Sequence, residues 1–471
     1  MGVGSGGVVV LDVGKTNAKL TLWDASGGGL LRRDRRNRPA SGPGYRALDA
    51  DGVEAWLADT LREFAGLARI RTIVPVAHGA AAALVHRGAL FVPPMDYEDE
   101  AGEAERAAYG RQRDPFAATG SPYLPQGLNL GLQLHRLEAL TGPWPNDLLI
   151  LPWPQYWAWR LSGVAASEAS SLGCHSDLWR PYERCATGLA TARGWSQRLA
   201  PLRRADEALG PITPEWAERT GLPSDCVVFC GMHDSNAALL GARGHAEIAA
   251  GDATVLSTGT WFVAMRSPGP AARSTPVELD EGRDCLVNVD AEGRPVPSAR
   301  FMGGREAELI AGAAAEPSDE RALIDRLPGL IAAGVQIHPS FAPGVGPFPN
   351  HRGGWSGEPA DITDRRAALA LYLALMADAS LDLIGSRDRL LVDGRFAAST
   401  AFVRALASLR PRQQVYVCDA EDDVAYGALR LVQPDRPPPS PLVPVQPLES
   451  SLEHYRARWR AGLAREPTGT V

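Results

Sequence analysis

Short apolar runs separated by polar turns open the chain. The pattern predicts strands at residues 8–13 and 18–24, joined by the polar loop Asp12-Val13-Gly14-Lys15-Thr16-Asn17-Ala18-Lys19, and a third strand at 30–36 after three glycines. The same unit returns further along, where Ser257-Thr258-Gly259-Thr260 separates apolar runs at 253–256 and 261–265. The repetition indicates an internal duplication at the level of the fold.

Helical spacing of apolar residues alternates with these strands. It predicts helices at 53–69, 128–141, 364–385 and 400–409, with further strands at 70–78, 226–230, 390–392 and 415–418. Alternating helices and strands of this kind are typical of an α/β fold. A proline-rich stretch at 434–447 precedes a predicted amphipathic helix at 448–465, whose Leu452, Tyr455 and Trp459 we expect to dock on the protein.

The length of 471 residues exceeds what one hydrophobic core usually supports. We therefore expect an N-terminal domain at 1–242, a C-terminal domain at 243–433, and a linker and terminal helix at 434–471. Hydrophobic residues make up 45% and charged residues 22%, which is typical of a globular protein in water.

The net charge of −7 argues against nucleic acid as a partner. The chain shows neither a membrane-spanning apolar run nor the basic start and apolar core of a secretory signal. Six cysteines are scattered along the chain, and Cys226 and Cys230 are predicted to be core thiols, so we expect a cytoplasmic protein. Monomer and homodimer both remain open.

Arginine replaces lysine almost everywhere. Among 48 basic residues only Lys15 and Lys19 are lysine, and both lie in the first polar loop. A compact ammonium suits a single phosphate oxygen better than a planar guanidinium does. Main-chain N–H groups and hydroxyls in the two Gly/Thr turns can add donors for an anion. The two turns together predict that a polyphosphate is held from two sides, although coincidence in a lysine-poor protein is an alternative for the lysines.

Two aspartates follow predicted strands. Asp12 at the first polar loop suits a hydrated magnesium ion beside bound phosphates, with a turn-forming role as the alternative. Asp234, in Gly231-Met232-His233-Asp234, suits a general base that accepts the proton of a hydroxyl during phosphoryl transfer. Its alternatives are a helix N-cap and, together with His233, half of a metal phosphohydrolase site.

Candidate groups for gripping a polyol are spread along the first half. The acidic loop at 95–100, which contains Asp96, is joined by His78, Gln155 and the aromatic residues Trp153, Tyr156 and Trp157. Carboxylates and amides can bond hydroxyls, while flat rings can cover the C–H side of a sugar. The alternative is an exposed charged loop beside an aromatic core cluster.

The order of several motifs resembles the FGGY carbohydrate kinases, a family of the actin-like and hexokinase-like ATPases. The motifs are Asp12-x-Gly14-x-Thr16-x-x-Lys19, Gly231-x-x-Asp234 with Ala237 and Gly241, and Leu256-Ser257-Thr258-Gly259-Thr260. Between them come Leu161-Ser162-Gly163, Ser167-Glu168-Ala169-Ser170, Trp195 and Thr220-Gly221-Leu222-Pro223.

The resemblance implies two ribonuclease-H-like domains with an interdomain cleft, ATP with Mg²⁺ as cofactor, and transfer of a phosphoryl group to a sugar hydroxyl. Asp234 would be the base and Asp12 would face the metal. The phosphate contacts would be Gly14, Lys15, Thr16, Asn17, Lys19, Thr258, Gly259 and Thr260. Sugar contacts would be His78, Gly79, Asp96, Gln155, His233 and Asp234. The histidine before Asp234 is similar to the rhamnulose and fuculose kinase branch, so a (deoxy)ketose such as L-rhamnulose or L-fuculose is the expected substrate.

Two segments depart from the family pattern. The adenosine motif is expected at Gly394, Arg395 and Phe396, where the usual double glycine and asparagine are replaced. The usual tryptophan-containing sugar loop is replaced by Met95-Asp96-Tyr97-Glu98-Asp99. A catalytically inactive nucleotide-binding regulator on the same fold is the main alternative, and a metal phosphohydrolase using His233 and Asp234 is the second.

Overall fold

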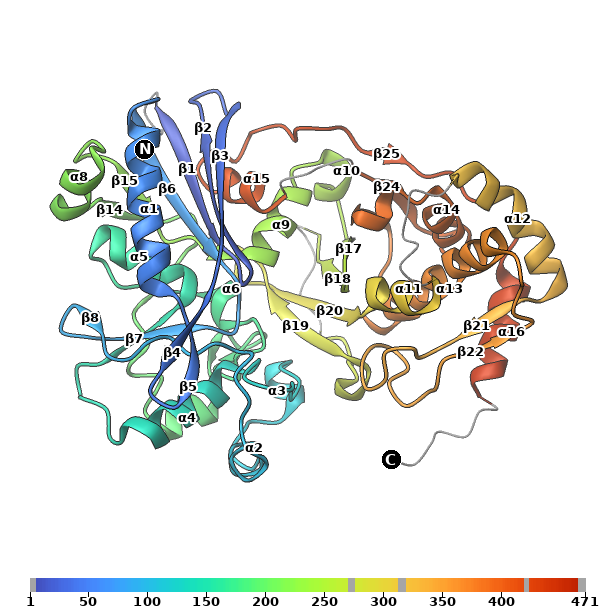
Figure 1. The fold of residues 1–471 in the computed structure, drawn as a ribbon, viewed down its shortest axis with the longest axis horizontal. Coiled ribbons are helices and arrows are strands. Elements are labelled where there is room, and N and C mark those ends of the chain that lie inside the picture. Colours follow the sequence, from blue (N-terminus) through green and yellow to red (C-terminus); the bar gives the residue numbers. More distant parts are fainter. Residues whose placement is uncertain (1–5, 270–275, 312–318, 419–422, 465–471) are drawn as a thin grey trace. The chain divides into compact units, whose positions relative to one another are not determined.

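The computed structural model describes residues 6–269, 276–311, 319–418 and 423–464 (Figure 1). The chain forms two compact units. The first comprises Met1–Gly244, Val287–Pro295 and Asp422–Pro438, and the second comprises His245–Leu286, Val296–Glu421 and Pro439–Val471.

The first unit is built on a mixed sheet with the strand order β14-β15-β6-β1-β2-β3, and β16 also pairs with β6. Strands β1, β2 and β3 form an antiparallel meander, whereas β6 runs parallel to β1, β15 and β16. The strands are β1 (Gly7–Val13), β2 (Asn17–Trp23), β3 (Gly29–Arg36), β6 (Ile70–Ala77), β14 (Ala208–Pro211), β15 (Val227–Phe229) and β16 (Met232–His233).

Helices cover both faces of this sheet, which explains the unbroken apolar run in β1. Val9 and Leu11 pack with α1 (Ala50–Ala65) and α5 (Trp153–Ser162). Val8 and Val10 pack with α9 (Asp234–Ala242) and α15 (Asp423–Arg430) on the other face. A Cβ atom at Gly427 would overlap the Ala237 carbonyl oxygen, so glycine permits the close approach of α9 and α15.

The second unit repeats this topology. Its sheet contains β20-β18-β17-β23-β24-β25 in that order, with antiparallel β20-β18-β17 and parallel β17-β23-β24. The strand order and directions match those of β3-β2-β1-β6-β15, which confirms the predicted duplication and the predicted α/β fold class. The strands are β17 (Ala253–Thr258), β18 (Phe262–Ser267), β20 (Pro295–Phe301), β23 (Arg389–Gly394), β24 (Gln414–Val417) and β25 (Val443–Pro444).

The other described elements are mostly short. In the first half they are β4 (Pro39–Gly42), β5 (Tyr45–Leu48), β7 (Ala82–His86), β8 (Ala89–Leu90), α2 (Glu103–Gly110), α3 (Phe116–Thr119), α4 (Leu130–Thr141), β9 (Leu149–Pro152), β10 (Ser167–Glu168), α6 (Ala169–Leu172), β11 (Trp179–Arg180), β12 (Cys185–Ala186), α7 (Gly188–Ala192), β13 (Leu202–Arg203) and α8 (Pro214–Thr220). In the second half they are α10 (Ala246–Ala249), β19 (Cys285–Val289), α11 (Gly303–Ala311), α12 (Glu320–Ala333), β21 (Gln336–His338), β22 (Gly354–Ser356), α13 (Ile362–Leu383), α14 (Thr400–Leu409) and α16 (Glu453–Leu463), with 3-10 turns at Glu281–Arg283 and Arg395–Ala398.

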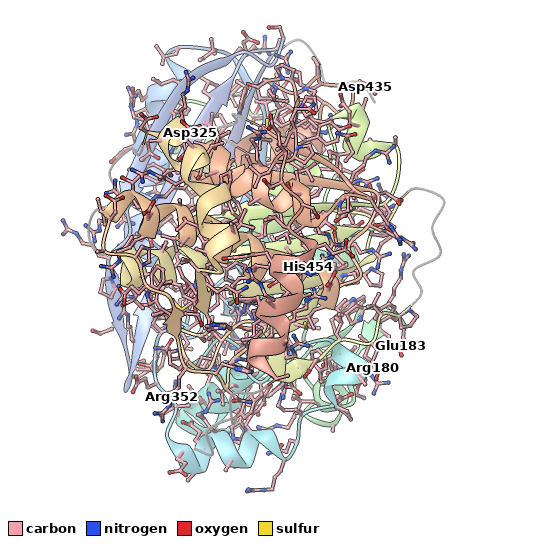
Figure 2. The ribbon with its side chains drawn as sticks, turned by 90° about the vertical axis from the view of Figure 1, so that its right-hand side faces the viewer. Arg180, Glu183, Asp325, Arg352, Asp435 and His454 are labelled. Carbon is pink, nitrogen blue, oxygen red and sulfur yellow. The ribbon has the colours of Figure 1, made fainter. Side chains whose placement is uncertain are left out.

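The terminal helix α16 docks on the second unit, as its pattern predicts. Leu452, Tyr455 and Trp459 are buried. The Tyr455 hydroxyl donates to the Val335 carbonyl at 2.7 Å, and the Trp459 ring N–H donates to that of Ile337 at 2.8 Å. His454 lies on the exposed side of the same helix (Figure 2). Among the described helices none combines the length and the apolar character needed to cross a lipid bilayer.

Candidate active site

Three parallel strands of the first unit end at one edge of the sheet, and the candidate catalytic residues lie there. Val76 of β6 pairs with Asp12 of β1 on one side and with Met232 of β16 on the other. The register therefore brings Asp12 and Asp234, which begins α9, to the same edge. Carboxyl ends of parallel strands are where α/β folds usually bind ligands.

Asp12 is almost completely buried. Its Oδ2 lies 3.7 Å from the Lys19 Nζ, while its Oδ1 has no hydrogen-bond partner among the described residues. Burial, with a further contribution from the negative charge of Asp234, raises the pKa of Asp12 to about 7. The two carboxylates thus repel each other, and a cation beside them would relieve that repulsion. One carboxylate with an open oxygen suits Mg²⁺, which keeps most of its water ligands.

Asp234 presents a carboxylate that is fixed on one side and partly open. Its Oδ1 accepts hydrogen bonds from the Ser235 backbone N–H at 2.6 Å and hydroxyl at 3.2 Å. The His233 Nε2 lies 3.2 Å from the same oxygen. The side chain remains 24% exposed, so a substrate hydroxyl can reach it.

A buried asparagine fixes the tautomer of His233. The Asn236 side-chain amide donates to His233 Nδ1 at 2.9 Å, so Nδ1 must act as the acceptor. Burial lowers the pKa of His233, which keeps the ring neutral and places its proton on Nε2. Nε2 lies near both Asp234 Oδ1 and the Cys174 sulfur, at 3.3 Å from the latter. Asn236 and His233 therefore position the carboxylate of Asp234.

On the expectation that Asp234 is the base of an ATP-dependent kinase, Asn236→Ala should lower kcat about tenfold without changing the KM for ATP, because His233 would lose the donor that fixes its tautomer. Steady-state kinetics of ADP release measures both constants. A variant with unchanged kcat at an unchanged melting temperature would show that the tautomer of His233 does not matter to the base.

The backbone of His233 is held by a second buried network. Its N–H donates to Ser170 Oγ at 3.2 Å, and the Ser170 hydroxyl in turn donates to Glu168 at 2.6 Å. Glu168 caps α6 by accepting the backbone N–H groups of Ser170 and Ser171. Despite these donors, burial raises the pKa of Glu168 to about 7.

The raised pKa of Glu168 predicts that the stability of the folded protein depends on pH. Because its pKa is higher in the folded than in the unfolded protein, the folded state binds more protons between about pH 4.5 and 7. This group therefore lowers stability as pH rises through that window. We expect Glu168→Gln to flatten the fall in melting temperature between pH 5 and 8, as measured by thermal unfolding. If the melting temperature of the variant falls with pH as steeply as that of the wild type, Glu168 does not have a raised pKa in the folded protein.

The position of Gln155 does not fit its predicted role as a sugar contact. The side chain is fully buried, and its amide donates to the carbonyl oxygens of Cys230 and Gly231 at 3.3 and 3.2 Å. It thus holds the strand end that leads to His233, and its role is to position that segment.

Lys15 also departs from the predicted arrangement. Its Nζ donates to Asp96 Oδ2 at 2.6 Å and lies 3.4 Å from Glu98. Asp96 is completely buried and accepts a second bond from Arg46 at 2.8 Å. The predicted phosphate lysine and the predicted sugar carboxylate thus neutralise each other, whereas the Lys19 Nζ lies 3.7 Å from Asp12 Oδ2.

His78 and Gly79 follow β6 and lie beside His233. The His78 Nδ1 contacts the Gly79 carbonyl at 2.8 Å, and its ring packs edge-on against Tyr97 at 5.6 Å. Burial lowers the pKa of His78, and the charges of both Asp234 and Lys15 act on it. A Cβ atom at Gly79 would crowd Cys174 and His233, so a glycine permits this packing.

The other residues of the first turn are held by hydrogen bonds to the end of β3. Gly14 and Thr16 lie between β1 and β2, and Asn17 begins β2. The Asn37 side chain donates to the Gly14 carbonyl at 2.8 Å, and the Asn37 N–H donates to that of Thr16. The turn is therefore fastened to the end of β3.

In the second unit, the predicted phosphate turn and the predicted adenosine segment lie side by side. Thr258 Oγ1 donates to the Asp393 carbonyl at 2.5 Å and accepts the Phe396 N–H at 2.9 Å. Gly394 has φ of 77°, and a Cβ atom there would overlap the Thr258 backbone. Gly259, Thr260 and Arg395 belong to the same two turns. The predicted nucleotide residues of this unit are thus neighbours.

Sequence reasoning missed Asn236, Ser170 as a partner of His233, and Cys174. Only Asn236 carried a signal, since it stands three residues after His233 at the start of a helix, where the side chains share one face.

Comparison with known proteins identifies the family of the chain. Residues 250–439 match the model of the carbohydrate kinase FGGY C-terminal domain. A carbohydrate kinase from Novosphingobium aromaticivorans is 49% identical over 98% of this chain and 99% of its own, with a TM-score of 0.94. No curated protein matches the chain.

More distant structures share the fold. A xylulose kinase from Lactobacillus acidophilus is 12% identical with a TM-score of 0.76, over 97% of this chain and 96% of its own. A Plasmodium falciparum glycerol kinase with ADP is 11% identical with a TM-score of 0.78, and the match covers 98% of this chain and 99% of that protein's chain. The fold and site define a phosphotransferase that acts on sugars. The chain belongs to the FGGY family of carbohydrate kinases.

Proposed function

We propose that the protein transfers the γ-phosphoryl group of ATP to a hydroxyl of a small free sugar, with Asp234 as the general base. The supporting observation is the Asp234 carboxylate, which is held through Oδ1 by Ser235 and His233 and is still partly exposed. A hydroxyl near this carboxylate can lose its proton as it attacks phosphorus.

In the first unit Lys19 and the turn at 14–17, and in the second unit the turn at 258–260, each carry groups suited to phosphate binding. In such turns main-chain N–H groups and hydroxyls point toward an anion. Members of this family use ATP, and we place the adenosine at Gly394, Arg395 and Phe396. Asp12 would hold a hydrated Mg²⁺, which when bound neutralises charge on the transferred phosphoryl group.

The sugar-binding residues are proposed at His78, Gly79, His233 and Asp234. The histidine before the base is the feature shared with the rhamnulose and fuculose kinase branch, so L-rhamnulose and L-fuculose are the first neutral sugars to test. Gln155 is assigned to the supporting structure because it is fully buried and its amide nitrogen donates to the Cys230 and Gly231 carbonyls. Asp96 is assigned there because it is fully buried and bonded to Lys15 and Arg46.

The test is coupled ADP release with Mg·ATP against a panel of ketoses, aldoses, polyols and sugar acids. At least one compound is expected to raise ADP release well above the sugar-free rate. A flat response across the whole panel would contradict the proposal and favour a regulatory nucleotide-binding role.

A further inference from the structure

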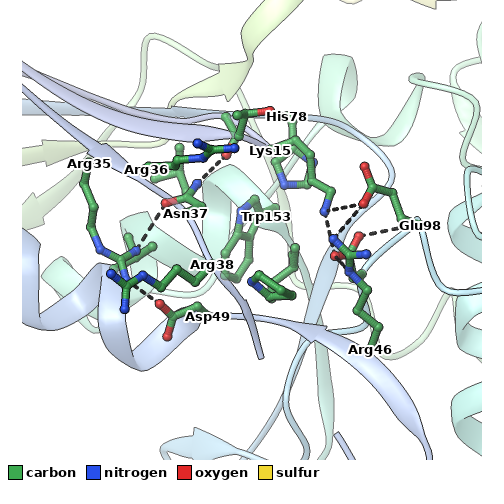
Figure 3. Close-up of a pocket in the computed structure, with 17 residues that line it drawn as sticks. Lys15, Arg35, Arg36, Asn37, Arg38, Arg46, Asp49, His78, Glu98 and Trp153 are labelled. Atoms are coloured by element: carbon green, nitrogen blue, oxygen red, sulfur yellow. Dashed lines mark hydrogen bonds and ion pairs between the residues drawn. The ribbon is translucent and has the colours of Figure 1, made fainter. Parts of the chain in front are cut away.

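A cavity of about 800 Å³ opens in the first unit beside the candidate sugar residues (Figure 3). It reaches from the turn after β1 to His78 and Trp153. Figure 3 shows Arg36 and Arg38 on one side, Lys15 and Arg46 with Glu98 on the other, and Trp153 between them. His78 lines the cavity, and the next residue lies against His233, since a Cβ atom at Gly79 would come within 3.0 Å of His233 Nε2.

The carboxylates expected to grip neutral hydroxyls are already occupied. Asp96 accepts bonds from Lys15 and Arg46 at 2.6 and 2.8 Å, and from the Glu98 N–H at 2.9 Å. Glu98 is paired with the same two cations, at 3.4 and 2.8 Å. A carboxylate saturated by cationic donors has little capacity left to accept a hydroxyl hydrogen bond.

The cavity instead has an excess of cationic donors. Five basic and three acidic side chains line it. Arg35 is paired with Asp49, and Lys15 and Arg46 are paired as above. Arg36 and Arg38 are exposed, and within the described ranges neither guanidinium has an ion pair or a side-chain hydrogen bond. The excess positive charge is therefore concentrated on the β3 side, in a chain whose net charge is −7.

We infer that this cavity binds an anionic sugar, and that the substrate carries a carboxylate or phosphate group that Arg36 and Arg38 recognise. Guanidinium groups bind such anions through paired, charge-assisted hydrogen bonds, which neutral deoxy-ketoses cannot accept as strongly. The inference rests on the proposed function and names the substrate class of the same site.

The experiment compares ADP release with neutral sugars, sugar acids and sugar monophosphates, using the wild type and the double variant Arg36→Gln/Arg38→Gln. The best substrate is expected to be anionic, and the sugar-acid and monophosphate arms identify which group it carries. The double variant is expected to raise the KM for that substrate about tenfold or more. Added KCl should raise the wild-type KM in the same direction.

Arg33→Gln is the matched control, because Arg33 also lies on β3 but is paired with Glu63 and does not line the cavity. Equal KM values for the double variant and this control would overturn the inference. Phosphorylation of neutral sugars alone would also overturn it, while leaving the kinase function intact. ADP release that no compound stimulates would refute both the function and the inference.

Discussion

Asp234→Asn is expected to lower kcat by about 10²–10⁴-fold while ATP binding stays intact. Asparagine has nearly the same shape and keeps an oxygen that can accept the hydrogen bonds from Ser235 and His233. It cannot take up a proton, so the attacking hydroxyl would lose its base. Coupled ADP release with the best sugar of the panel gives kcat, and isothermal titration with ATP gives the binding constant.

Asp225→Asn is a suitable control for this loss. Asp225 is an exposed aspartate of the same unit, ion-paired with Arg71. We expect its replacement to leave turnover unchanged. Normal turnover in the Asp234 variant would show that another group accepts the proton, and the assignment of the base would be wrong.

The strands could be predicted because their pattern is local. The apolar run from Val8 to Leu11 predicts a strand, and the structure shows this strand with α1 and α5 on one face and α9 and α15 on the other. The repeated strand, Gly/Thr turn, strand unit predicts the duplicated topology for the same reason. Each signal lies within about ten residues of sequence.

Elements whose stability comes from distant partners were missed. The hairpin β4-β5 and strand β20 received no prediction, and Pro295 and Pro297 obscure the strand character of β20. β20 is nevertheless a strand because it pairs along β18, from Phe262 with Phe301 onward. Tertiary pairing here overrides local preference.

The prediction of site residues was limited in the same way, because side-chain partners can be distant in sequence. Lys15 and Asp96 were each assigned a ligand, yet they lie 81 residues apart in sequence and form an ion pair with each other. Their residue types indicate charge but not partners, because pairing depends on how the acidic loop folds over the first turn. In contrast, Asp12 and Asp234 follow predicted strands, and the register of parallel strands brings such ends together.

Asp12→Asn is expected to act in opposite directions on activity and stability. Loss of the carboxylate should lower kcat/KM for Mg·ATP by about 10²–10³-fold, because the charge that faces the metal is removed. The same change removes a buried charge whose Oδ1 has no partner among the described residues. At pH 8 it should stabilise the ligand-free protein by on the order of 2–4 kcal/mol.

The sign of the stability effect follows from the raised pKa of Asp12, about 7 in the folded protein. Above pH 7 the folded state holds an unfavourable buried charge, whereas near pH 5 the carboxyl is largely protonated and the variant should gain little. Thermal unfolding at both pH values measures this, with Asp24→Asn in the β2–β3 turn as the control. A variant less stable than the wild type at pH 8 would show that Lys19 compensates the buried carboxylate fully. Asp12 would then be a structural residue, and its proposed place beside the metal would lose its physical basis.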